Sequence, residues 1–131
     1  MVVPEDNASA EFTHPKFRMW LPPDGVVRLV WAPHVPSGLE DATAAIEAMR
    51  ELTGDRQAPL LVDMTDAGPQ DRSARMEFIR RHEVVSAVAL IAGNPLSRMM
   101  ANFFINVSKP KAPTRLFEDE AAAFAWLKEY V

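Results

Sequence analysis

The chain has 131 residues, which fits a single domain, and 48% of them are hydrophobic, enough for a core without covalent cross-links. It contains no cysteine, so disulfides, thiolate nucleophiles and cysteine-bound metals are excluded. Its 14 basic and 18 acidic side chains leave a net charge of −4 with no dense basic face, which argues against a nucleic-acid partner.

The first residues carry neither a basic segment nor a long apolar run, so no signal peptide is expected. No stretch reaches the roughly 20 apolar residues that a membrane-spanning helix needs. We therefore expect a cytoplasmic protein without a transmembrane segment. Residues 1–15 are polar and unpatterned and are expected to form a loose N-terminal arm before a single α/β domain over residues 16–131.

The domain begins with a predicted β-hairpin. Residues 17–21 and 26–31 are apolar runs, and the four residues between them, Pro22-Pro23-Asp24-Gly25, form a strong turn signal. A helix is predicted next, because Ser37 and Glu40 have the Ser-x-x-Glu spacing of a capping box. This helix is expected to end at Gly54 and to bury four apolar residues, Leu39, Ala42, Ile46 and Met49.

The rest of the chain alternates between predicted strands and helices. Short apolar runs predict strands at 58–64, 84–91 and 114–117, and helices are expected at about 72–82, 94–107 and 119–130. Asp71 and Asn94 are suited to helix caps, and Pro95 to the first helical position. The order ββαβαβαβα predicts a mixed, mostly parallel sheet of five strands with four helices, since strands joined through helices run parallel.

The helix over residues 94–107 has the clearest apolar periodicity in the chain. Its core face is expected to consist of Leu96, Met100, Phe103 and Val107. Three further residues, Met99, Phe104 and Ile105, widen the apolar arc beyond what one sheet face covers. Such a surplus favours a homodimer interface over a ligand pocket, because symmetric dimers are the commonest soluble assembly.

Several segments resemble one known family. They are Leu61-Val62-Asp63-Met64-Thr65, Met100-Ala101-Asn102-Phe103-Phe104, Pro113-Thr114-Arg115-Leu116-Phe117 and Ala125-Trp126-Leu127. With the predicted element order, they make roughly residues 17–130 resemble STAS domains, the SpoIIAA-like fold of anti-sigma-factor antagonists, and in particular a small bacterial group of uncharacterised STAS-like proteins. The resemblance implies an α/β fold and a role in protein contacts, and it implies no catalytic chemistry.

The wider STAS pattern has a loop reading Asp-x-Ser and, six residues later, Asp-Ser-Ser-Gly, in which the first serine of the pair takes phosphate. Asp63 and Thr65 match the first element, and Asp71 and Ser73 match two positions of the second. Arg72 stands at the acceptor position, and an arginine cannot carry this phosphate. The resemblance therefore implies a regulatory loop from Asp63 to Ser73 in which Thr65 and Ser73 are the available hydroxyls.

Two other groups of residues are candidates for chemistry. Asp63, Asp66 and Asp71 could together bind Mg²⁺ or act in acid/base catalysis, although caps and turns are the ordinary use of aspartate. Asn94, Ser97 and Arg98 begin a helix, where exposed N–H groups and a guanidinium could bind an anion. The three histidines share no metal-ligand spacing, and neither a metal nor another cofactor is expected.

The sequence thus predicts a non-enzymatic regulatory module that acts through protein contacts and forms a homodimer. The alternative is a carrier or sensor of a small apolar or anionic ligand, because STAS-like domains are similar in outline to CRAL-TRIO lipid carriers. That ligand would lie between the 94–107 helix and the sheet, with Arg98 holding any negative head group. An enzyme that uses the aspartate loop ranks last.

Overall fold

The computed structural model describes residues 10–131, which contain one six-stranded sheet with the strands in sequence order. The three strands at the start pair antiparallel and all later neighbours pair parallel, so the sheet is mixed, as predicted. The strands are β1 (Ala10–His14), β2 (Phe17–Leu21), β3 (Val27–Trp31), β4 (Ala58–Asp63), β5 (Val85–Ile91) and β6 (Thr114–Phe117).

The sixth strand corrects the prediction of five. β1 pairs with β2 from Ala10↔Leu21 to His14↔Phe17, so residues 10–14 are not part of a loose arm. The first nine residues of the predicted arm lie outside the described part of the chain. A polar segment can add to a sheet because the ladder is made by backbone groups, and here one alternate side chain, Phe12, packs on the core.

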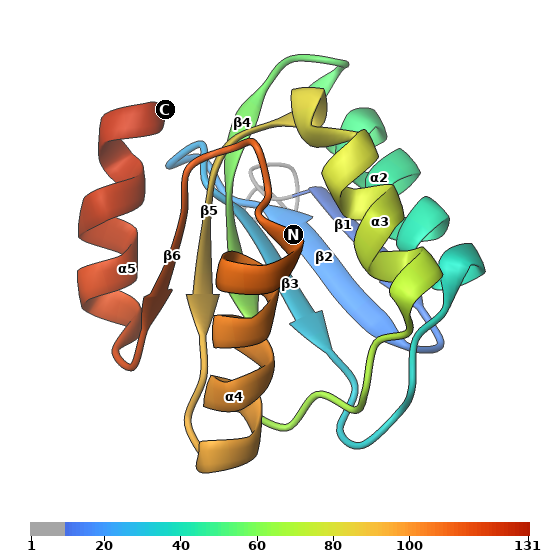
Figure 1. Ribbon diagram of the computed structural model, residues 1–131. Helices are drawn as coiled ribbons and strands as arrows, with labels where there is room; N and C mark the ends of the chain where they lie inside the picture. The colour runs from blue at the N-terminus through green and yellow to red at the C-terminus, as the bar shows by residue number, and fades with distance from the viewer. Residues whose placement is uncertain (1–9) are drawn as a thin grey trace.

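The helices divide between the two faces of the sheet (Figure 1). They are α2 (Leu39–Thr53), α3 (Arg72–Arg80), α4 (Pro95–Phe103) and α5 (Glu120–Leu127), with shorter turns η1 (His82–Val84), η2 (Phe104–Ser108) and η3 (Lys128–Tyr130). Helices α2, α3 and α4 each join parallel neighbours in a sheet whose strands progress in one direction, so right-handed crossovers place all three on one face. Of the described helices, α5 covers the other face.

Each face of the sheet has its own core. Under α5, small alanines at 87, 89 and 123 allow close packing, and Leu127 is fully buried among them. The opposite face carries larger side chains, among them Met19, Leu29 and Met49, which pack under α2, α3 and α4. The two cores explain why β4 and β5, buried on both sides, read as nearly continuous apolar runs.

The start of α2 lies one residue later than predicted. Gly38 occupies the cap position, and its N–H donates to the Asp41 carboxylate at 2.9 Å, whereas Ser37 makes no cap. Ala42, Ile46 and Met49 are buried as predicted, but Leu39 is exposed, because it faces outward in the first turn. At the other end Gly54 adopts the left-handed conformation and terminates the helix, as predicted.

The orientation of α4 is the main correction to the predicted core. Its inward face is formed by Ser97 and Ala101, both fully buried, followed by Phe104 and Ile105, which pack against the core. The exposed fractions of four apolar side chains expected inside or at an interface are high: Leu96 58%, Met99 61%, Phe103 45% and Val107 62%. The small Ser97 and Ala101 let α4 approach the sheet closely, which turns the large residues of the neighbouring stripe outward.

The helices among residues 10–131 are all too short or too polar to span a bilayer. The predicted helix caps at Asp71 and Asn94 are confirmed. Asp71 accepts a hydrogen bond from the Ala74 N–H at 2.9 Å, and Asn94 accepts one from the Ser97 N–H at the same distance.

Candidate functional site

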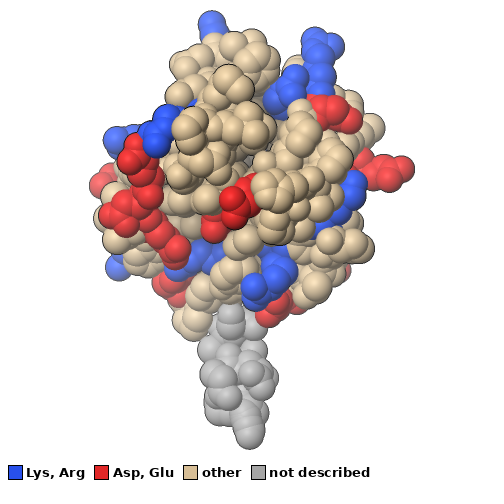
Figure 2. All heavy atoms as spheres, turned by 90° about the horizontal axis from the view of Figure 1, so that it is seen from below, with Lys and Arg blue, Asp and Glu red and all other residues tan. Residues whose placement is uncertain are grey.

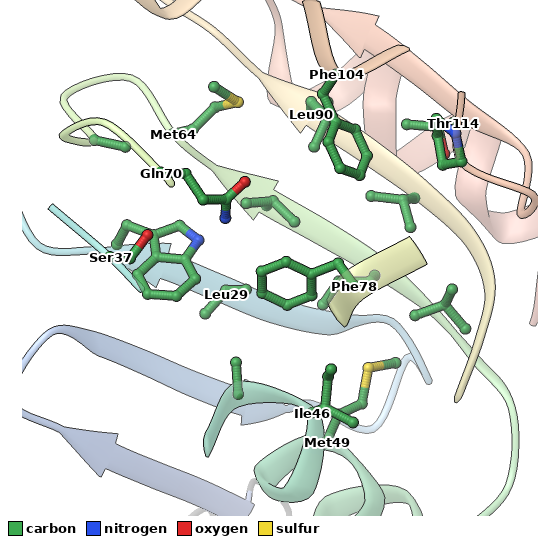
Figure 3. Close-up of a pocket in the computed structure, with 18 of the residues that line it drawn as sticks. Leu29, Ser37, Ile46, Met49, Met64, Gln70, Phe78, Leu90, Phe104 and Thr114 are labelled. Atoms are coloured by element: carbon green, nitrogen blue, oxygen red, sulfur yellow. The ribbon is translucent and has the colours of Figure 1, made fainter. Parts of the chain in front are cut away.

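A cavity of about 140 Å³ lies between the sheet and the layer formed by α2, α3 and α4 (Figure 3). The sheet supplies one wall through residues of β2 to β6, and the helices supply the other. Protein interiors are close-packed and contain few voids larger than a water molecule. A space of this size in the centre of the domain is therefore the feature most in need of a functional explanation.

The walls of this central cavity are almost entirely apolar. Figure 3 shows side chains from the strands and from the helices converging on the same space. The strands contribute Met19, Leu29, Trp31, Leu60, Val62, Val88 and Leu90, and the helical layer contributes Ala45, Ile46, Met49, Phe78, Met100, Ala101 and Phe104. Alanines at 45 and 101 in this layer leave volume that larger side chains would fill.

Two loops close the cavity at the edge where the parallel strands end. The segment after β3 and the segment after β4 lie against each other and are joined by backbone hydrogen bonds: His34 N–H to Asp66 O at 2.8 Å, Ser37 N–H to Pro69 O at 3.0 Å and Asp71 N–H to Ser37 O at 3.1 Å. The approach is close at Gly68, where a Cβ atom would lie 2.6 Å from the Val35 carbonyl. Glycine is needed at this position because no side chain fits between the two backbones.

The polar side chains of this closed end are Ser37 and Gln70. Both line the cavity, and Figure 3 shows them on the same side of it. Only 8% of Ser37 is exposed. No hydrogen bond within residues 10–131 involves the Ser37 hydroxyl or the Gln70 side-chain amide, and neither is a fully buried unpartnered group, so both remain accessible at the cavity. The closed end of the cavity thus offers donors and acceptors that a bound molecule can use.

The opposite end of the cavity is bordered by Arg81 and His82, which follow α3 where β5 begins. The Arg81 guanidinium is already paired: its Nε lies 3.0 Å from a Glu83 oxygen, and its Nη1 lies 3.7 Å from a Glu47 oxygen. Thr114, on the β6 wall, donates its hydroxyl to the Ala112 carbonyl at 2.9 Å. Apart from the partly buried imidazole of His82, the polar side chains at this end already form ion pairs or hydrogen bonds with other residues of the chain.

The predicted regulatory loop from Asp63 to Ser73 lies on the edge of the sheet that Figure 2 views, where acidic side chains gather near the middle and along one side. Asp63 accepts a hydrogen bond from the Thr65 N–H at 3.0 Å, and Asp66 is exposed. Arg72 and Ser73 are exposed on the first turn of α3. Part of the same loop, including Gly68 and Gln70, forms the closed end of the cavity.

Asp71 is a helix cap in this loop. The hydrogen bond from the Ser73 hydroxyl, at 2.7 Å, and the one from the Ala74 N–H lower the pKa of its carboxyl below the ordinary value. Asp71 is therefore held ionised in its capping role. No group of three or more histidine and acidic side chains among residues 10–131 is arranged to hold a metal ion.

The predicted anion site is occupied by its own hydrogen bonds. The Asn94 carbonyl oxygen of the side chain and the Ser97 hydroxyl complete a reciprocal cap, and Ser97 is fully buried. Arg98 forms an ion pair with Glu118 and does not line the central cavity. The structure does join this site to the regulatory loop, because the Asn94 amide donates to the Thr65 carbonyl.

The sequence indicates a ligand site between the 94–107 helix and the sheet only as an alternative, and it gives no sign of the polar pair at the closed end. Its capping-box spacing predicts Ser37 as the cap of α2, but Gly38 and Asp41 fill that role, and this shift leaves the serine hydroxyl facing the cavity. One signal was present in the sequence. The helix contains alanines at 42, 44, 45 and 48, whereas a fully packed helix would carry larger residues at some of these positions.

A family model for a domain of unknown function, DUF7793, matches residues 19–131. The chain belongs to the DUF7793 family. No protein of curated function matches this DUF7793 domain. Its family therefore establishes relationship without supplying an activity.

The fold of the DUF7793 domain is shared with a solved structure. An uncharacterised DUF3478-family protein with a SpoIIAA-like fold, from Shewanella loihica PV-4, is 14% identical, with a TM-score of 0.58 over 92% of each chain. A protein of unknown function from Arthrobacter sp. FB24 is 30% identical over 83% of this chain and 96% of that chain, with a TM-score of 0.33. The first comparison confirms the SpoIIAA-like fold that the sequence predicted.

Proposed function

We propose that this DUF7793 domain is a binding module that takes a small apolar molecule into the cavity between its sheet and the α2, α3 and α4 layer. The observation that carries the proposal is the cavity of about 140 Å³ with apolar walls in the centre of the domain. This corresponds to the ligand carrier or sensor that the sequence left as its alternative. This proposal assigns no catalytic step to the domain.

The energetic argument compares the cavity with the stability of a small domain. Unfilled volume in a closed core costs about 24 cal/mol per Å³, so this partly open space costs at most about 3 kcal/mol. Small domains are stable by only about 5–15 kcal/mol. A ligand that fills the void restores the missing contacts, whereas a purely structural domain gains nothing from leaving it empty.

The size of the cavity limits the ligand. An engineered apolar cavity of about 150 Å³ binds benzene. The cavity here has a similar volume, and its walls carry several flexible methionines, Met19, Met49, Met64 and Met100, which adapt to irregular shapes. A molecule of about one aromatic ring, or a short branched chain, matches these walls.

The proposal also gives the predicted regulatory loop a role. Gly68 and Gln70 belong to the loop and border the cavity, while Arg72 and Ser73 of the same segment lie at the surface. A ligand in the cavity would contact Gly68 and Gln70 and would therefore shift the surface residues of the same loop that a partner protein can contact. In this way the domain acts as a sensor whose ligand state is read at the 65–73 surface.

Benzene titration tests the binding proposal. In two-dimensional ¹H–¹⁵N spectra, we expect benzene to shift amide signals of cavity residues and to saturate in the millimolar range. The variant Ala45→Leu fills the cavity from α2 and should abolish this saturation, while Thr43→Leu places the same side chain on the exposed face of α2 and should not. Absence of saturable shifts in the unmodified chain would overturn the proposal.

We further propose that the domain forms a homodimer through the exposed apolar stripe of α4 and η2. The stripe consists of Leu96, Met99, Phe103 and Val107. Of the interface residues predicted from sequence, Met99 lies on it, whereas Phe104 and Ile105 pack inward. The Arg75 guanidinium lies 5.1 Å from the centre of the Phe103 ring and gives the stripe a polar border.

Sedimentation at micromolar concentrations tests the dimer. We expect twice the monomer mass for the unmodified chain and a monomer for Met99→Glu, because a charge at the centre of the stripe cannot be buried without a partner. Leu39→Glu is the matched control, since it places the same charge at an exposed apolar position on α2. A monomer mass for the unmodified chain would contradict this proposal and leave the cavity proposal standing.

A further inference from the structure

We infer that the cavity takes its ligand in one orientation, with a neutral hydrogen-bonding group held by Ser37 and Gln70 and an apolar body extending along the sheet toward Val88. The ligand class is a small amphipathic molecule that carries a hydroxyl, amide or carbonyl group at one end and has no formal charge. This inference rests on the proposed function and specifies the chemistry of the same site.

The first observation is the state of the Ser37 hydroxyl. The residue is more than nine-tenths buried, it lines the cavity, and its hydroxyl has no partner within residues 10–131. Since no side-chain oxygen or nitrogen in the described residues is both fully buried and unpartnered, this hydroxyl is accessible from the cavity, where a bound molecule can reach it. The backbone N–H of Ser37 donates to the Pro69 carbonyl and its carbonyl accepts from the Asp71 N–H, so the position of the residue beside the cavity is fixed.

The second observation is that Gln70 supplies complementary groups beside it. Ser37 and Gln70 form an isolated parallel bridge between the two closing loops, so their side chains are brought to the same end of the cavity. Figure 3 shows the Gln70 amide directed into the space between the strands and the helices. Together the pair offers three donor hydrogens and two acceptor oxygens, which suits a group that both donates and accepts.

Charge decides which end of the cavity holds the polar group. The guanidinium at the far end, Arg81, is paired with Glu83 and Glu47, so an anion there would have to displace two carboxylates. The closed end has no charged side chain on its walls. A neutral polar group is therefore favoured at Ser37 and Gln70, because a charged one would be buried without a counter-ion.

A matched pair of probes, phenol and benzene, tests the orientation because they differ only by one hydroxyl. We expect the unmodified chain to bind phenol about fivefold tighter than benzene, the ratio that one net hydrogen bond of about 1 kcal/mol provides. In the variants Ser37→Ala and Gln70→Leu, phenol should bind no tighter than benzene, while benzene affinity should change less than twofold. The control Thr43→Ala removes an exposed hydroxyl of α2 and should keep the fivefold preference.

Stability measurements give a second readout. Since the Ser37 hydroxyl has no protein partner, Ser37→Ala should unfold at the same or a higher urea concentration than the unmodified chain in the absence of ligand. A clear loss of stability would mean that the hydroxyl has a structural role, and it would overturn the inference.

The outcomes separate the two proposals. Saturable benzene binding with no preference for phenol would overturn the oriented site and leave the apolar cavity intact. Binding of neither probe would overturn both. Retention of the phenol preference in Ser37→Ala and in Gln70→Leu would show that the polar group lies elsewhere in the cavity, which also contradicts the inference.

Discussion

The two faces of the sheet differ in how completely they are packed. Under α5, alanines at 87, 89 and 123 and the fully buried Leu127 form a core of small residues that one short helix covers. On the other face three helices cover the sheet, yet a cavity of about 140 Å³ remains beneath them. On the proposed function, the α5 face is a scaffold, and the α2, α3 and α4 face leaves the space in which a ligand binds.

The largest expected effect comes from comparing a leucine-to-alanine variant on each face of the sheet. Leu127→Ala removes a fully buried side chain from the α5 face and should lower the free energy of unfolding by about 4 kcal/mol, near the upper part of the range for buried leucines. Leu60→Ala removes the same atoms from the cavity wall, where fewer contacts exist to lose, and should cost about 2 kcal/mol. Urea unfolding of the two variants measures both values.

Equal losses, or a larger loss at Leu60, would contradict the comparison, because they would mean that the cavity wall is packed as densely as the α5 face. Both side chains are leucine and both are less than one-tenth exposed. The difference between the variants therefore reports packing and not the chemistry of the substitution.

The next largest effect comes from alanine-to-leucine variants on each face, which should change the free energy of unfolding in opposite directions. Ala45→Leu extends into the cavity from α2 and should raise the free energy of unfolding by about 1 kcal/mol, because it buries apolar surface in existing space. Ala123→Leu adds the same atoms to the α5 face and should lower it by about 2 kcal/mol through overpacking. Thermal or urea unfolding gives the sign directly, and two losses of similar size would be inconsistent with a ligand cavity.

The smallest effect concerns the attachment of α2 to the cavity face. Burial raises the pKa of Asp41, but the hydrogen bonds from the Gly38 N–H and from Lys16, at 2.9 Å, outweigh it and lower the pKa below the ordinary value of 3.8. The stabilisation that follows is complete above that value and is lost as the pH falls through the lowered pKa. The free energy of unfolding should therefore fall more between pH 7 and pH 3 for the unmodified chain than for Asp41→Asn.

The control for the pH experiment is Glu40→Gln, which changes the neighbouring exposed carboxylate of the same helical turn and leaves both hydrogen bonds of Asp41 in place. Its pH dependence should match that of the unmodified chain. The same slope in Asp41→Asn as in the unmodified chain would show that Asp41 does not couple protonation to the docking of α2.

Local sequence signals were sufficient for most elements of the fold. The turn at Pro22 to Gly25, the helix caps at Asp71 and Asn94 and the terminator at Gly54 are confirmed, because each depends on hydrogen bonds or backbone angles within a few residues. The start of α2 shows the limit of such signals. Ser37 and Gly38 both suit a cap, and the pairing of Ser37 with the loop after β4 decides between them.

Signals of periodicity were less decisive for α4. Two neighbouring stripes of this helix are apolar, and a 3.6-residue period describes either of them. The stripe that carries Ser97 and Ala101 faces the sheet because its small side chains permit close approach, and the stripe of Leu96, Met99, Phe103 and Val107 is left outside. Strand β1 was missed for a related reason, since its place at the sheet edge depends on a backbone ladder with β2 and only weakly on side chains.

The order of strands β2 to β6 and of the helices, the SpoIIAA-like fold and the caps at Asp71 and Asn94 were therefore determined by the sequence itself, because they rest on local periodicity and backbone geometry. The tertiary structure alone decided which stripe of α4 is buried, where a void remains and which polar groups face it. Those features depend on how side chains from segments far apart in the chain fill a shared volume. Ser37 and Gln70, separated by 33 positions along the chain, meet at one end of a cavity that neither segment forms alone.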